Sequence, residues 1–465
     1  MTTSLSLRQR LLRGMQAQVA AHAVRVIIQV AGVSLLVSTW GLSRYGDWLI
    51  LAAIPNYIAF SDIGFVGAAM NEMIMAAGRE DRPRALEVFK AVSSALLVLF
   101  ALLTILVPLV GSVVPVASLL NLGTLSNTAA RWILVMLAAD ALLEVYAGLF
   151  YGGFAAEGRY GEGSLWMTAL LLAEFCGLAG AVLLGGGPEL GAAAMLVVRA
   201  VGTVVMYAAM RRRVPWLAFG RPARVWPELR RLFSPALASG AIPAALILNI
   251  QGMVVLLGVT VGPAGAAIFS TVRTLSRAVN QLLASIFAVI TPEISRAYAT
   301  QDQDLVRRLH RRGCQLAVWL ALPPAVVLAV FGDPILELWT SGKVSSSGLL
   351  LDIFLVGVVV DALWTTSLGV LYATNRHQRV AAYYFAGSLI SVAVAYPLIE
   401  AWGLDGAAVA VLLLELFMPI PVLRQALPAA YDDLRGLIAT IVRPPISMGS
   451  TRAALRALRA QVPRP

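Results

Sequence analysis

Two arginines lie near the middle of an apolar stretch, residues 265–293, that is long enough to cross a bilayer as one helix. Arg273, Arg277 and Asn280 follow the spacing of three and four that puts side chains on one helical face. Each arginine at membrane depth costs roughly 2.5–3.5 kcal/mol on insertion scales. We therefore expect this face to line a protein-enclosed or water-filled space. Because a guanidinium group pairs bidentately with phosphate oxygens, the chemistry it predicts is the binding of an anion.

A second polar stripe lies in the first apolar segment of the chain. Gln18, His22, Arg25 and Gln29 are separated by four, three and four residues, which again places them on one helical face. We interpret this stripe as a second wall of the same cavity. Packing against polar neighbouring helices is the alternative that the residues leave open.

Other ionisable residues within apolar segments have different predicted roles. Glu174 and Arg199 lie at similar depth on consecutive antiparallel segments, which predicts a structural ion pair. Asp62, in a Ser-Asp-x-Gly sequence, is a candidate for ion coupling, and a hydrogen-bonded structural aspartate is the alternative. Glu415 has no evident partner in the sequence.

The composition indicates an integral membrane protein. Hydrophobic residues make up 59% and charged residues 13% of the 465 residues, whereas soluble proteins are about a quarter charged. The first apolar segment lacks a signal-peptide cleavage pattern, so we expect it to be retained. Cys176 and Cys314 lie far apart, so we predict no disulfide, and the sequence suggests no metal site and no cofactor.

Twelve apolar segments are long enough to span a membrane. They lie at about 16–42, 47–70, 88–110, 129–150, 164–185, 190–210, 233–258, 265–291, 314–332, 349–371, 380–400 and 406–427. The predicted domains are a basic cytoplasmic N-terminus (1–13), an N-terminal six-helix half (14–210), a basic connector (211–232), a C-terminal six-helix half (233–427) and a basic tail (428–465). The tail contains a predicted amphipathic helix capped by Ser450.

The distribution of lysine and arginine predicts the orientation. If both termini are cytoplasmic, the outer loops contain three of the 36 basic residues: Arg44, Arg131 and Lys343. Four more, Arg25, Arg199, Arg273 and Arg277, lie deep within the spans, and the remaining 29 lie on the side of the termini, in loops or at the ends of spans. The net charge of +11 therefore reflects membrane orientation and does not indicate a nucleic-acid partner.

The two halves repeat at an offset of 221 residues. Asp81 matches Asp302, and Asp140-Ala141-Leu142 matches Asp361-Ala362-Leu363. Because Asp140 recurs as Asp361, a structural role is favoured for both. Six spans per repeat give both halves the same orientation. The predicted fold is thus an all-α polytopic membrane protein, with twelve transmembrane helices in two parallel six-helix repeats around a central cavity.

Three short motifs carry a resemblance to a known family: YGDW at 45–48, SDIGF at 61–65, and TPEISRAYATQDQDLVRRLHRR at 291–312, whose acidic-then-basic helix is expected between spans eight and nine. With the twelve-span layout, they resemble the oligosaccharide flippases of the multidrug/oligosaccharidyl-lipid/polysaccharide exporter superfamily. A segment at 78–84, GREDRPR, is weakly similar to a loop motif of major-facilitator transporters, and the three motifs above outweigh it.

The resemblance implies a flippase in the bacterial inner membrane. Its substrate would be an undecaprenyl-pyrophosphate-linked oligosaccharide, such as an O-antigen or exopolysaccharide repeat unit, moved by alternating access and coupled to protons or sodium. Membrane lipids and polysaccharide-assembly proteins are the other expected partners. One alternative is a drug or small-cation antiporter, which would need an acidic cavity. A flippase for the peptidoglycan lipid precursor ranks lower, because no extra pair of helices is found. A membrane enzyme also ranks lower, because the outer loops are short.

Overall fold

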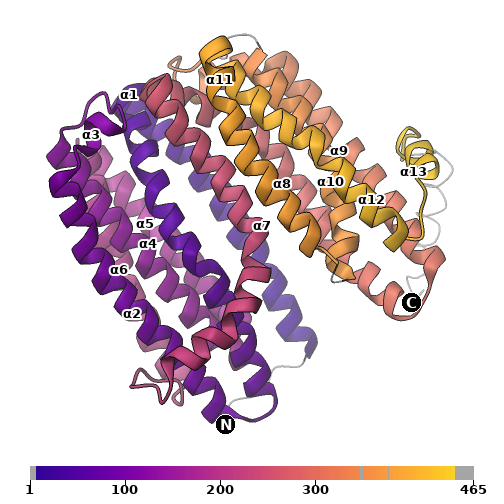
Figure 1. Ribbon diagram of the computed structural model, residues 1–465, viewed down its shortest axis with the longest axis horizontal. Coiled ribbons are helices and arrows are strands. Elements are labelled where there is room, and N and C mark those ends of the chain that lie inside the picture. The colour runs from indigo at the N-terminus through magenta and orange to yellow at the C-terminus, as the bar shows by residue number, and fades with distance from the viewer. Residues whose placement is uncertain (1–6, 346–348, 375, 446–465) are drawn as a thin grey trace, which may run out of the picture. The chain divides into compact units, whose positions relative to one another are not determined.

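The computed structural model describes the backbone of residues 7–345, 349–374 and 376–445. Side chains are described in these ranges except at 7–20, 58–63, 110–112, 238–239, 282, 284–286, 288–289 and 292. The secondary structure of this part of the chain is helical (Figure 1). The helices are α1 (Leu7–Gly78), α2 (Arg82–Val113), α3 (Val116–Leu119), α4 (Asn127–Ala156), α5 (Tyr160–Leu183), α6 (Pro188–Arg213), α7 (Val225–Thr260), α8 (Pro263–Ala299), α9 (Gln303–Trp339), α10 (Leu349–Ala373), α11 (Gln378–Phe417), α12 (Pro419–Ala429) and α13 (Leu434–Ile441).

Nine helical stretches in the described part are long and apolar enough to cross a membrane. A helix suits a bilayer because it satisfies its backbone hydrogen bonds internally. Two stretches contain an internal glycine with a non-helical backbone: Gly41 in α1 (φ 77°) and Gly403 in α11 (φ 58°). Each glycine joins two helical segments. The prediction of an all-helical, multi-pass membrane protein is confirmed, whereas twelve crossings and cytoplasmic termini stay predictions.

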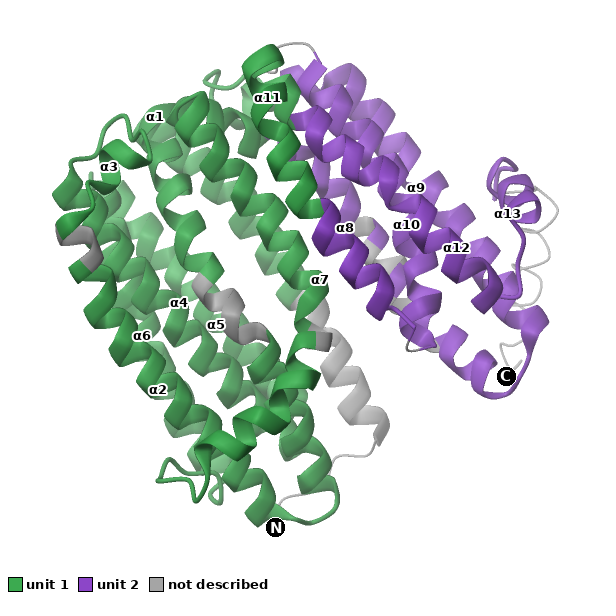
Figure 2. Cartoon of the chain, in the orientation of Figure 1, with its two compact units in different colours: residues 1–271, 336–345, 388–407 green, residues 272–335, 346–387, 408–465 purple. Residues whose placement is uncertain are grey.

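The chain forms two compact units (Figure 2). Unit 1 comprises residues 1–271, 336–345 and 388–407, and unit 2 comprises residues 272–335, 346–387 and 408–465. Helices α1 to α7 thus belong to unit 1, while α10 and most of α8 and α9 belong to unit 2.

Corresponding turns in the two sequence repeats have the same local geometry. Glu80 and Gln301, which are 221 residues apart, both have a positive φ, at 63° and 59°. The residues that follow them cap the next helix: the Arg84 amide donates to Asp81 Oδ1 at 3.0 Å, and the Leu305 amide donates to Asp302 Oδ1 at 2.9 Å. This agreement is what a structural repeat predicts. The expected separate helix in 291–312 is wrong, because α8 continues to Ala299 and α9 begins at Gln303.

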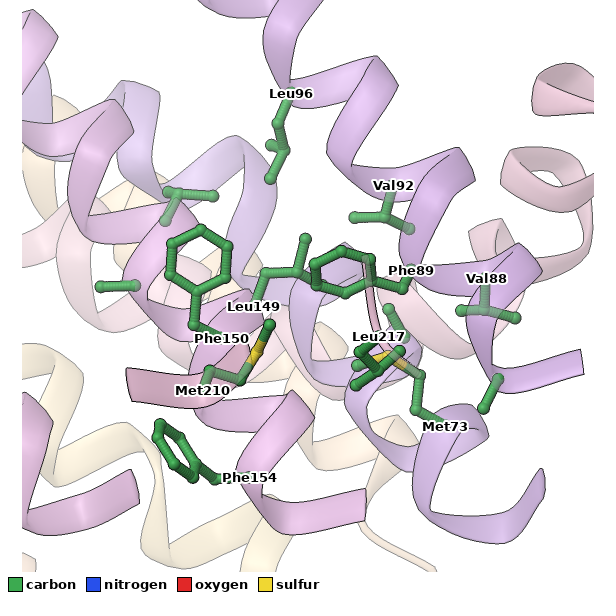
Figure 3. Packing of buried hydrophobic residues seen from close by; sticks show 14 of the residues in the cluster. Met73, Val88, Phe89, Val92, Leu96, Leu149, Phe150, Phe154, Met210 and Leu217 are labelled. Atoms are coloured by element: carbon green, nitrogen blue, oxygen red, sulfur yellow. The ribbon is translucent and has the colours of Figure 1, made fainter. Parts of the chain in front are cut away.

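The basic connector packs against the core of unit 1. Leu217 is fully buried in a hydrophobic cluster with Phe89 and Phe150 (Figure 3). Arg84 on α2 donates two hydrogen bonds to Glu228 at the start of α7, at 2.6 and 2.5 Å. These hydrogen bonds, opposed by partial burial, hold the pKa of Glu228 below its ordinary value. The connector is therefore fixed to this unit by both apolar contacts and an ion pair.

In unit 2, the segment that follows α12 folds back onto α9. His310 Nδ1 lies 2.9 Å from Asp432 Oδ2, Arg311 Nε donates to Asp432 Oδ1 at 2.6 Å, and Trp319 Nε1 donates to the Ile441 carbonyl at 2.8 Å. Burial alone would raise the pKa of Asp432, but the hydrogen bonds from His310 and Arg311 lower it below its ordinary value. The predicted helix capped by Ser450 lies outside the described residues.

Candidate functional site

Unit 1 contains a polar cavity of about 420 Å³. Its polar lining comes from α1, α4, α5 and α6. The lining residues are Arg25, Ile28, Gln29, Glu144, Ser164, Met167, Thr168, Leu171 and Arg199. A volume of this size lies within the usual range of ligand sites. The cavity therefore offers two guanidinium groups, an amide, two hydroxyls and one carboxylate to a ligand.

The polar stripe predicted on the first span contributes to this cavity in part. Arg25 and Gln29, one helical turn apart, both line it. His22 is exposed on α1 and is not among the lining residues, and the side chain of Gln18 lies outside the described residues. The side chain of Asp62, the candidate for ion coupling, also lies outside them.

A cluster of charges forms the wall behind this cavity. Arg199 Nη2 donates to Glu174 Oε2 at 2.6 Å, and Arg199 Nε also contacts Glu174. The same guanidinium lies 3.8 Å from Asp140 Oδ1 and 3.7 Å from Glu144 Oε2. The side chains of Glu174 and Arg199 are 4% and 5% exposed, whereas that of Glu144 is 53% exposed. The structure thus pairs the two residues predicted from depth alone and adds two carboxylates to them.

In unit 2, the predicted face of α8 also lies against acidic residues. Asn280 Nδ2 donates to Asp361 Oδ2 at 2.9 Å, and Trp364 Nε1 donates to Glu415 Oε2 at 2.9 Å. Arg277 is half-buried and interacts electrostatically with both acids. Glu415 therefore has partners that the sequence did not reveal. For Asp361, the signal in the sequence was that it recurs as the counterpart of Asp140.

Arg273, one helical turn before Arg277, is buried, with 9% of the residue exposed. In the described part of the chain, the cavity-lining arginines of α1 and α6 belong to unit 1, and Arg273 and Arg277 belong to unit 2. The residues that the sequence predicted to line the cavity are arginines, amides and a histidine, with no carboxylate among them. The lining in unit 1 instead combines arginines with Glu144, and the α8 face in unit 2 combines Arg277 with two carboxyl groups.

The YGDW motif has an architectural role in the structure. A Cβ atom at Gly46 would lie 1.9 Å from the carbonyl oxygen of Pro263, so only glycine permits this approach. Asp47 is fully buried and accepts hydrogen bonds from the amides of Gly123 and Thr124, at 2.9 and 2.8 Å. The motif therefore holds the loop before α4 in place and contributes no residue to the cavity.

The fold of the chain is similar to that of solved transporters, one of which is described as a member of the MOP superfamily. The chain is similar to an inward-facing multidrug resistance MATE family transporter, with a TM-score of 0.66, 15% identity, and coverage of 91% of this chain and 97% of that chain. It is also similar to the lipid II flippase MurJ in an inward closed conformation, with a TM-score of 0.69, 12% identity, and coverage of 97% and 94%. Neither a protein-family model nor a curated protein matches the sequence. At these identities the similarity is one of fold.

Proposed function

We propose that this protein is a flippase that moves an undecaprenyl-pyrophosphate-linked oligosaccharide across the bacterial inner membrane. The observation that carries the proposal is the cavity of unit 1, where Arg25, Gln29 and Arg199 present hydrogen-bond donors. A guanidinium group fits the oxygens of a pyrophosphate, and a polar pocket lowers the cost of bringing that charge into a membrane. The fold shared with MATE transporters and MurJ supports alternating access as the mechanism.

In this mechanism the headgroup enters the polar cavity while the polyprenyl chain remains in lipid. Arg25 is exposed on α1 and reaches the cavity from a different helix than Arg199. The two groups can therefore hold one anion from two sides. Arg273, Arg277 and Asn280 are the proposed contacts in unit 2, and a proton or sodium gradient is the proposed energy source.

The test is complementation of surface-glycan assembly in a strain that lacks its oligosaccharide flippase. Arg25→Ala, Arg273→Ala and Arg277→Ala should each reduce glycan output at matched expression, and Arg25→Lys should retain part of it if charge matters more than bidentate geometry. Arg212→Ala, an exposed arginine at the end of α6, is the matched control. Wild-type output from all three alanine variants would exclude this site.

A cation or drug antiporter is the second candidate, and the carboxylates around Arg199 favour it. Asp140, Glu144 and Glu174 outnumber the single arginine that they contact. An antiporter should confer resistance to cationic drugs that is lost in Glu144→Gln. A flippase should instead restore glycan output without drug resistance. Rescue of cells depleted of their lipid II flippase would assign the substrate to the peptidoglycan precursor.

A further inference from the structure

Glu144 differs from the other acids of the unit 1 cluster in being open to the cavity. Its side chain is 53% exposed, whereas those of Asp140 and Glu174 are 9% and 4% exposed. Glu174 forms the close contacts with Arg199, and Glu144 approaches the same guanidinium only to 3.7 Å. Glu144 is thus a loosely held counter-ion, on the side of Arg199 from which a ligand would approach.

The charges that face Glu144 come from each helix that lines the cavity. They are Arg25 from α1, Asp140 from α4, Glu174 from α5 and Arg199 from α6. When all are ionised, these groups and Glu144 carry three negative charges and two positive ones. A phosphate-type headgroup that enters this cavity must therefore compete with a carboxylate already beside the guanidinium, and it meets repulsion from that carboxylate.

We propose that Glu144 is an internal competitor of the anionic headgroup. In the empty cavity its carboxylate occupies the cavity side of Arg199. The pyrophosphate headgroup displaces it. The negative charge of Glu144 therefore opposes headgroup binding at Arg199. This inference rests on the proposed function, because it takes the ligand to be an anionic headgroup.

The experiment measures binding of farnesyl pyrophosphate to the full chain in phosphatidylcholine nanodiscs by calorimetry. Wild type and Glu144→Gln are compared at pH 7.5. Removal of the competing charge should make Glu144→Gln bind the probe about tenfold tighter than wild type.

Two variants control for structural effects. Glu144→Asp keeps a carboxylate at this position and should bind the probe with a Kd close to that of wild type. Glu189→Gln removes an acid that lies on α6 but outside the cavity, and its Kd should equal that of wild type. A purely structural role for Glu144 would weaken binding or leave it unchanged, and would not tighten it.

The outcomes separate this inference from the function on which it rests. Tighter binding of the probe by Glu144→Gln than by wild type supports the inference. Equal or weaker binding by Glu144→Gln, with the probe still bound by wild type, overturns the inference alone. If wild type does not bind the probe but Arg25→Ala has lost glycan output, headgroup competition at Glu144 is overturned and the flippase remains. If wild type does not bind the probe and Arg25→Ala keeps wild-type glycan output, both the inference and the proposed function are overturned.

Discussion

Removal of Arg199 should destabilise the protein more than removal of any exposed arginine. In Arg199→Met, the carboxylates of Glu174 and Asp140 stay in place with only 4% and 9% of their side chains exposed. Loss of one partner from a buried ion pair typically costs about 3–5 kcal/mol, because the remaining charge is uncompensated. At roughly 2.1 cal/mol/K of unfolding entropy per residue, we expect Tm to fall by about 3–5 °C in a cooperatively unfolding chain of 465 residues.

The assay is thermal unfolding of the purified protein in detergent at matched pH and salt. The double variant Glu174→Gln with Arg199→Met should recover part of the lost Tm, because it neutralises one of the two buried carboxylates that Arg199→Met leaves without their arginine. Arg212→Met, exposed on the same helix, should change Tm by less than about 1 °C. A Tm for Arg199→Met within 1 °C of wild type would refute the reasoning, as would a double variant no more stable than Arg199→Met.

Three further predictions concern packing, pH and topology. Gly64→Ala should destabilise the protein by about 1–3 kcal/mol in the same assay, because the new Cβ would lie 2.4 Å from the Ala236 carbonyl oxygen. Folding lowers the pKa of Asp432, so its carboxylate stabilises the folded protein. This stabilisation should be lost as the pH falls below the unfolded pKa of about 3.9 and through the folded pKa, which a series of Tm measurements between pH 6 and pH 3 would show. Cysteines placed at Ser341 or Leu122, in a Cys176→Ala background, should label from outside with a membrane-impermeant reagent.

Each of these predictions has a matched control. Gly67→Ala lies on the same helix with open space around its Cβ position, so equal loss in Gly67→Ala and Gly64→Ala would contradict the packing argument. Asp432→Asn should flatten the acid side of the stability profile, and an unchanged profile would contradict the role of Asp432. A cysteine at Ala223, in the connector, should not label in intact cells, and its labelling from outside would reverse the predicted orientation.

The sequence by itself determined the class of protein, the approximate helix positions and one buried contact. Long apolar segments require helices, since no other open structure satisfies the backbone in lipid. The Glu174–Arg199 pair could be predicted because α5 and α6 are consecutive and joined by a short turn that contains Gly185, with φ at 83°. Counting residues from such a turn places two side chains at equal depth, and the structure brings them within 2.6 Å.

Only the tertiary structure decided which helices share a cavity and what charge that cavity has. Arg25, Glu144 and Arg199 come from helices far apart in the sequence, and Glu415 meets Trp364 across 51 residues. In a soluble protein, the apolar side of a helix shows which face packs inward. In a membrane, lipid is as apolar as the interior, so helix neighbours depend on small residues and close packing. Close contacts such as that between Gly46 and Pro263 determine which helices are neighbours, and the hydropathy pattern does not show these contacts.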